Sequence, residues 1–185
     1  MQILRKSNCK TLTDPDLRDL GIYRRGLETW LILASPYTIL PQAQASQVTA
    51  RVLALVNIAR AKGARCGSRT FEPAEALRTS DRLAMAAAGH AADMARHEYL
   101  EHRDRAGRSP ADRARASGYQ FQTVGENIAS GPTTPDEVVQ GWMRSPSHCE
   151  NIMDSRFTQM GIAYAPARSA RRGLYWVQVL AAPRP

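Results

Sequence analysis

The sequence has few cysteines and few aromatic residues, and it lacks the short motifs of several common functional sites. Its three cysteines, Cys9, Cys66 and Cys149, form no Cys-x-x-Cys pair, so neither a zinc ribbon nor a thioredoxin-like site is supported. No Gly-x-Ser-x-Gly motif marks a serine nucleophile. Aromatic residues make up 6% of the chain, and no basic stripe studded with them indicates nucleic-acid binding.

Size and composition favour a single soluble domain. The 185 residues are 43% hydrophobic and 23% charged, which is enough apolar material for one core of ordinary size. The formal net charge is +8. Such a balance favours acidic partners, and we expect lipid, cell-wall polymer or another anionic envelope component rather than nucleic acid. The alternative is an arginine-rich surface that is merely solvated.

The first 45 residues resemble a targeting region. Residues 1–23 show little periodicity, and we treat them as an N-terminal extension, for which an over-extended start is one explanation. Residues 24–45 begin with a basic pair, continue as an apolar run and end in the small-x-small site Ala43-Gln44-Ala45, which is the pattern of a secretory signal peptide. Proline interrupts the run, so an ordinary buried segment is the alternative, and the run is too broken for a membrane span. We predict a signal peptide over 24–45, one domain over 46–185, and a secreted or periplasmic location.

Helical patterns occupy the first part of the predicted domain. An apolar period of 3.6 residues runs from Val48 to Ala59, and Gly63 would end that helix. Thr79 or Ser80 can cap a second helix. One face of this second helix gathers apolar side chains together with a histidine; the face consists of Leu83, Ala87, His90, Ala91 and Met94.

Later helices are marked by their first residues. Ser109-Pro110 opens a short helix, and Thr134-Pro135-Asp136-Glu137 is a capping box with proline at the first helical position. Pro146 interrupts the helix that follows, and Ser147 can cap a further turn that contains His148. A helix N-terminus at this point would disfavour the charged form of His148.

The end of the chain is predicted to form strands. Residues 157–164 and 173–180 have strand patterns and are joined by an arginine-rich hairpin loop, while residues 119–130 can be extended. In 173–180 the set Tyr175, Val177 and Val179 alternates with the set Trp176, Gln178 and Leu180, as in a sheet that is covered on both faces. Helices followed by strands predict an α+β fold with an antiparallel sheet.

A carboxylate and two histidines are the principal candidate site residues. Glu126 lies between a glycine and an Ile-Ala pair, and a buried carboxylate needs a partner because its desolvation costs on the order of several kcal/mol. The candidate partners are His148 and His102, and we expect the three to share a pocket. The alternative is that Glu126 is structural and bonds to backbone amides or to an imidazole.

Other polar residues in these segments are expected to be structural. His90 lies on an apolar helix face, where a hydrogen bond to backbone or to another polar group is the main expectation. Asp93 is predicted to make a structural hydrogen bond, and Asn127 to hold the turn after Glu126. Ser145 adjoins His148 in sequence, but adjacency does not establish a nucleophile and its base.

These residues resemble the CAP superfamily (cysteine-rich secretory proteins, antigen 5 and pathogenesis-related 1; also called the SCP domain), in particular its bacterial branch. The resemblance runs from about Val48 to Ala181. It rests on His90-Ala-Ala-Asp93-Met94-Ala95, His102, Gly118-Tyr119, Gly125-Glu126-Asn127-Ile128-Ala129, Trp142 to Met153, Phe157, Met160-Gly161 and Tyr175-Trp176-Val177-Gln178. It implies a three-layer α-β-α sandwich with a central antiparallel sheet. It also implies an extracytoplasmic protein, in which Cys66 and Cys149 can form a disulfide; in a reducing cytosol they would stay free thiols.

The resemblance also implies a site. In animal and plant members two histidines and two glutamates line a central cavity that sometimes holds a divalent metal. His102, Glu126 and His148 match three of these positions, whereas the second glutamate falls near Ser145. Two imidazoles and one carboxylate can hold Zn²⁺ with an open position. The missing acid, for which Glu150 or Glu101 would have to substitute, puts that metal in doubt.

Three functions follow as hypotheses. The first is an extracytoplasmic binding module whose His/Glu pocket takes a small ligand, a metal or an envelope component. The second is a peptidase-like hydrolase in which Glu126 activates water and the histidines hold zinc or move protons. The third is a structural or adhesive envelope protein with an inert pocket. We expect a protein that binds rather than catalyses.

Overall fold

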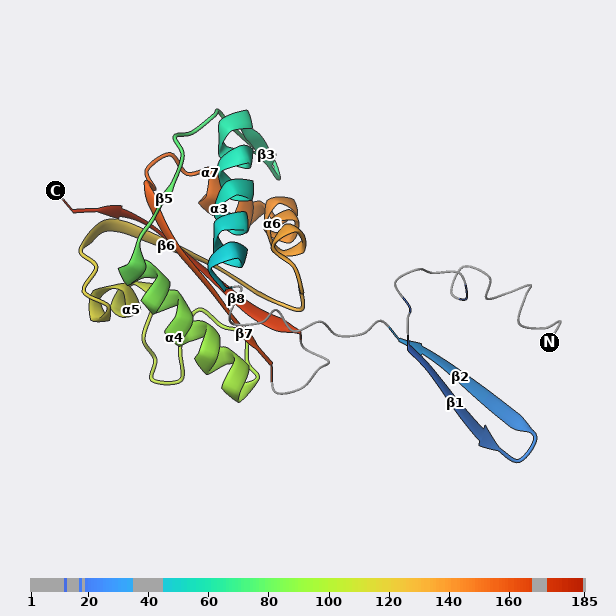
Figure 1. Cartoon of the computed structure of the whole chain (residues 1–185). Helices are drawn as coiled ribbons and strands as arrows, with labels where there is room; N and C mark the ends of the chain where they lie inside the picture. Colours follow the sequence, from blue (N-terminus) through green and yellow to red (C-terminus); the bar gives the residue numbers. More distant parts are fainter. Residues whose placement is uncertain (1–11, 13–16, 18, 35–44, 168–172, 185) are drawn as a thin grey trace. The chain divides into compact units, whose positions relative to one another are not determined.

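A computed structural model describes residues 12, 17, 19–34, 45–167 and 173–184 (Figure 1). The chain divides into two compact units, residues 1–38 and 39–185. In the first unit, β1 (Asp19–Arg25) and β2 (Glu28–Ala34) form an antiparallel hairpin. The predicted signal peptide overlaps this hairpin and extends into residues outside the described ranges, so the signal peptide remains a prediction.

The second unit contains the helices and a four-stranded sheet. Its elements are α3 (Ala45–Lys62), β3 (Ala64–Cys66), β4 (Arg69–Phe71), β5 (Arg78–Thr79), α4 (Asp81–His97), α5 (Pro110–Ala116), β6 (Phe121–Ser130), α6 (Pro135–Arg144), α7 (Pro146–Met153), β7 (Gln159–Pro166) and β8 (Leu174–Pro183). The sheet order is β5-β7-β8-β6, and β3 pairs separately with β4. Strand β6 therefore lies at one edge of the sheet.

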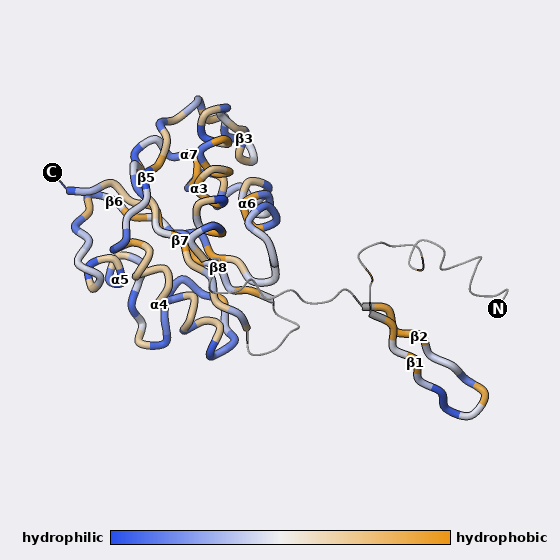
Figure 2. Tube along the Cα trace, in the orientation of Figure 1, coloured by the Kyte–Doolittle hydropathy of each residue, from blue (hydrophilic) through white to orange (hydrophobic). Residues whose placement is uncertain are grey.

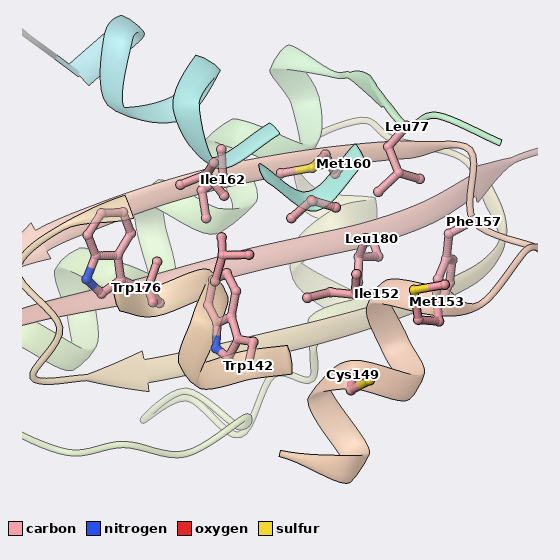
Figure 3. Close-up of a cluster of buried hydrophobic side chains, with 14 of the residues drawn as sticks. Leu77, Trp142, Cys149, Ile152, Met153, Phe157, Met160, Ile162, Trp176 and Leu180 are labelled. Carbon is pink, nitrogen blue, oxygen red and sulfur yellow. The ribbon is translucent and has the colours of Figure 1, made fainter. Parts of the chain in front are cut away.

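Strand β8 lies between β7 and β6 in the sheet, and helices cover both of its faces. Alternate residues along it belong to two different apolar clusters. Leu174, Trp176 and Leu180 join the cluster formed with α3, α6 and α7, part of which Figure 3 shows. Their neighbours Tyr175, Val177, Val179 and Ala181 join the cluster formed with α4 and α5. The hydrophobic colour of the central strands in Figure 2 follows from this double cover.

The predicted fold class is confirmed: the second unit is an α+β sandwich with helices on both faces of the sheet. Strands β6, β8 and β7 are antiparallel, as expected. The short strand β5 adds a parallel pairing of two residue pairs with β7, which the sequence did not indicate. The arginine-rich loop falls largely on residues 168–172, outside the described ranges.

Most helix starts agree with the sequence. Ser80, Ser109 and Thr134 are the N-caps of α4, α5 and α6, and the last two form complete capping boxes. The cap assigned to Ser147 is wrong. Helix α7 begins at Pro146 with Ser145 as its N-cap residue, because proline suits the first helical position, where no amide donor is needed.

A disulfide joins Cys66 to Cys149, with their Cα atoms 5.4 Å apart. It links the end of β3 to α7 and thereby fixes the helix that carries His148. In the part of the chain that the structure describes, no helix has the length and apolar character needed to cross a membrane.

Candidate functional site

Glu126 is the centre of the candidate site. It lies on β6 opposite Val179 of β8, and its side chain is buried on the sheet face that α4 and α5 cover. Oε1 of its carboxylate lies 2.8 Å from Nδ1 of His102, and Oε2 accepts a hydrogen bond of 2.6 Å from Nη2 of Arg113. Both oxygens of this buried acid therefore have cationic or polar partners, which offset its desolvation.

Arg113 is the site residue that sequence reasoning missed. It is 6% exposed, and its Nη1 donates to the backbone oxygens of His102 and Arg108 at 3.0 and 2.8 Å. One guanidinium thus binds the buried carboxylate and fixes the backbone that carries the histidine. The signal in the sequence was weak: Arg113 lies in the short helix opened by Ser109-Pro110, next to Ala114, which is also buried.

His102 lies at the solvent boundary of this network. Half of its side chain is exposed (52%), whereas that of Glu126 is 1% exposed. An ionised carboxylate can only accept hydrogen bonds. Nδ1 of His102 therefore carries the ring proton and donates a hydrogen bond to Oε1 of Glu126. Nε2 then has an available lone pair. A buried acid that orients a half-exposed imidazole in this way prepares it to bind a polar group or to accept a proton.

His148 and Ser145 belong to the opposite side of the β6 edge. His148 lies in the first turn of α7, and its Nδ1 is 2.9 Å from Oγ of Ser145. Asn127, whose side chain lies on the other face of β6 from Glu126, donates from Nδ2 to the backbone oxygen of His148 at 3.1 Å. The same Asn127 amide donates to Gln178 on β8 at 2.9 Å. Asn127 therefore ties α7 to the strand that carries Glu126.

The two imidazoles are close enough for their charges to interact. Burial lowers the pKa of His148, and repulsion from the protonated form of His102 lowers that pKa further. The expectation from the sequence was a helix N-terminus as the cause, whereas burial is the largest contribution. Of the predicted pocket residues, the structure brings His102 into contact with Glu126, and His148 into contact with Ser145.

The remaining polar candidates lie deeper or along α4. Nε2 of His90 is 2.9 Å from the backbone oxygen of Glu101 and 4.0 Å from Oε1 of Glu126. Burial lowers the pKa of His90, partly countered by the negative charge of Glu126. Asp93 accepts a hydrogen bond from the hydroxyl of Tyr99. These contacts place both residues in the polar framework beside the site.

The residues present do not fit a metal held by two histidines and two acids. Among the described residues, no group of three or more His, Cys, Asp or Glu side chains is arranged to hold a metal ion. The guanidinium of Arg113 occupies one carboxylate oxygen of Glu126, and a fixed cation there opposes a second cation. Glu150 instead pairs with Arg69 at 2.8 Å.

Fold and site together define an α-β-α sandwich with a histidine–glutamate pair at a sheet edge. Residues 53–180 match the model of the CAP family, which is described as the cysteine-rich secretory protein family. The chain belongs to this family. It is similar to the uncharacterized protein YkwD of Bacillus subtilis, with 35% identity over 102 residues, which are 55% of this chain and 38% of that protein. The chain therefore matches well under half of that relative's length.

Solved structures agree in fold. An extracellular protein of Bacillus anthracis that contains an SCP domain aligns with a TM-score of 0.64 and 22% identity, over 83% of this chain and 46% of that one. An outer surface protein of Borrelia burgdorferi aligns with a TM-score of 0.54 and 22% identity, over 60% of this chain and 80% of that one. At these identities the likeness shows the fold alone.

Proposed function

We propose that this chain is an extracytoplasmic binding module that uses His102 and His148 to recognise a polar group of an envelope component. The observation that carries the proposal is the half-exposed imidazole of His102, oriented by a buried Glu126 that Arg113 neutralises. The proposed location is supported by the disulfide and by relatives described as extracellular or as outer surface proteins.

A binding role fits this geometry better than metal chemistry. Because Arg113 and His102 already satisfy the Glu126 carboxylate, the acid is an anchor rather than a metal ligand or the direct base for water. His102 offers Nε2 outward, where it can accept a hydrogen bond from a ligand. The surplus of 25 basic over 17 acidic residues favours anionic envelope material at the same time.

A hydrolase is the second candidate, and one contact favours it. The 2.8 Å contact between Glu126 and Nδ1 of His102 is the arrangement of an acid–histidine pair, in which the acid orients the imidazole that accepts a proton. In such an enzyme His102, rather than Glu126, would take the proton from water. Hydrolysis of a muropeptide by the wild type, lost in His102→Gln, would establish this candidate over the first.

The binding proposal is tested by thermal unfolding in the presence of three separate probes: soluble muropeptides, phosphatidylglycerol vesicles and zinc chloride. A ligand that binds the native state raises its stability by RT ln(1 + [L]/Kd). We expect muropeptides or vesicles to raise the Tm of the wild type and to have no effect on His102→Ala. Zinc should produce no histidine-dependent rise.

His97→Ala is the matched control, because His97 is a surface histidine at the end of α4 that the site does not use. This variant should respond to the probes as the wild type does. If none of the probes shifts the Tm, or if His102→Ala and His97→Ala respond alike, the binding proposal fails and the inert envelope protein is favoured.

A further inference from the structure

A cavity lies between α4 and α5, and Arg113 is part of its lining. Its volume is about 400 Å³, within the range of small-ligand sites. Helix α4 contributes Met85, Gly89 and His90 to its lining, and α5 contributes Arg113 and Ala116. We call this cavity the α4–α5 groove. Its lining shares Arg113 with the site described above but does not include His102, Glu126 or His148.

Two buried nitrogens on lining residues of this groove have no hydrogen-bond partner. Among the described residues, Nδ1 of His90 and Nε of Arg113 are the buried side-chain atoms left in this state. The two side chains are 1% and 6% exposed. A buried polar atom without a hydrogen bond costs about 1–3 kcal/mol of stability. Two such atoms on residues that line one cavity point to a ligand group that would bond to both of them.

The chemistry of the two nitrogens defines that partner. Nε2 of His90 faces the backbone oxygen of Glu101, which can only accept, so Nε2 carries the ring proton. Nδ1 of a neutral imidazole is then an acceptor, whereas Nε of Arg113 is always a donor. A hydroxyl group within reach of both nitrogens matches this pair, because it can donate a hydrogen bond to Nδ1 of His90 while its oxygen accepts one from Nε of Arg113.

The charges around the groove favour a neutral ligand. Arg113 is paired with Glu126 at 2.6 Å, and Arg108 with Asp104 at 2.8 Å. Within each pair the charges compensate, and the third lining carboxylate, Asp93, already accepts a hydrogen bond from the hydroxyl of Tyr99, so no unpaired cation is left in the lining to attract an anion. The carboxylate of Asp104 and the side chain of Met85 add further polar and apolar contacts, a combination that suits a compound carrying several hydroxyls on a carbon ring.

A glycine keeps the groove open. Gly89 lies within α4, where glycine costs about 0.5–1 kcal/mol relative to alanine. A Cβ placed on Gly89 would meet no atom within 4 Å, so neither its φ angle nor close packing requires the missing side chain. A larger residue at this position would project into the groove that Gly89 lines.

We propose that the α4–α5 groove binds a neutral, polyhydroxylated ring of monosaccharide size, with one hydroxyl bridging His90 and Arg113. Both nitrogens are shielded from bulk solvent, so binding includes a small adjustment of the side chains above them. This inference goes beyond the proposed role of His102 and His148 and does not depend on it.

The test is a titration of the ¹⁵N-labelled full chain, followed by amide chemical shifts, with glucose, N-acetylglucosamine and myo-inositol in turn. Chitotriose is a further arm, which distinguishes a free sugar from the end of a polymer. We expect saturable shifts in α4 and α5 with at least one of these probes. Gly89→Leu should fill the groove and raise the Kd by at least about tenfold.

Gly141→Leu is the matched control, because Gly141 also lies within a helix, α6, with no atom within 4 Å of an added Cβ. It should bind the sugar as the wild type does. Binding of chitotriose without the free sugars still supports the proposal and assigns the source to a polymer. The proposal is overturned if no probe binds, if Gly89→Leu binds unchanged, or if an experimental structure shows that ordered water alone satisfies both nitrogens.

Discussion

At the scale of single residues, the buried part of the site depends on a charge balance between Glu126 and Arg113. Glu126 alone would be an uncompensated buried charge, and Arg113 removes that cost while it also fixes the backbone of His102. The sequence identified the acid, because a glutamate among apolar residues needs a partner. It could not identify which of the 25 Lys and Arg residues forms the ion pair with Glu126. The partner is 13 positions away, and only the packing of α5 on β6 brings it near.

Arg113→Ala is expected to destabilise the protein by about 3–5 kcal/mol, because it leaves the carboxylate of Glu126 buried beside only an imidazole. Urea unfolding at neutral pH measures the loss. Arg51→Ala is the control: the Arg51–Asp136 pair has the same 2.6 Å separation, but both side chains are more than half exposed. It should cost about 0–1 kcal/mol.

The double variant Arg113→Met with Glu126→Gln tests the cause. Removing the charge of Glu126 should recover part of the stability that Arg113→Met loses, because no ion is then buried without a partner. Equal losses for Arg113→Ala and Arg51→Ala would contradict the charge argument.

At the scale of helices and strands, local sequence signals were sufficient where the cause is local. Ser80, Ser109 and Thr134 cap helices because their hydroxyls accept backbone amides three residues ahead. Ser147 failed as a cap because Pro146 already occupies the first position of α7. The Oγ of Ser145, the residue at the N-cap, is 2.9 Å from Nδ1 of His148 instead.

Close packing of α4 on β7 depends on Gly161. This glycine is part of the family resemblance, but the sequence alone did not show why a glycine is needed there. A Cβ on Gly161 of β7 would overlap the backbone of Leu83 and Ala84 in the first turn of α4. Gly161→Ala should therefore separate the two elements and cost about 1–3 kcal/mol or more. Differential scanning calorimetry should show a clear fall in Tm.

Gly141→Ala is the companion variant to Gly161→Ala. An added Cβ at Gly141 meets open space within helix α6, so the substitution should leave the stability unchanged or raise it by up to about 1 kcal/mol. A Gly161→Ala protein as stable as Gly141→Ala would show that α4 does not approach β7 as closely as described.

At the scale of the whole second unit, the disulfide is the longest covalent constraint. It spans a sequence separation of 83 and holds α7, which carries His148, against β3. Closing a loop of this length removes conformational freedom from the unfolded chain, which stabilises the fold by about 4–5 kcal/mol at most in the chain-entropy model.

Reduction with dithiothreitol should therefore lower the midpoint of urea unfolding. The variant with both Cys66→Ala and Cys149→Ala should start from the lower midpoint and show no further change on reduction. A midpoint of the wild type that is insensitive to the reductant, with free thiols confirmed by mass spectrometry, would contradict the predicted stabilisation.

The sequence by itself determined the fold class and most helix starts, and it marked Glu126 as an acid in need of a partner, because periodicity, capping and the cost of burying a charge act locally. It also indicated the pair Cys66 and Cys149 through the family's pattern. Tertiary structure alone decided the partner of Glu126, the two faces of β6 that separate Glu126 from Asn127, and the groove beside Gly89. These features depend on which distant surfaces pack together, and many distant pairings are compatible with the same local pattern.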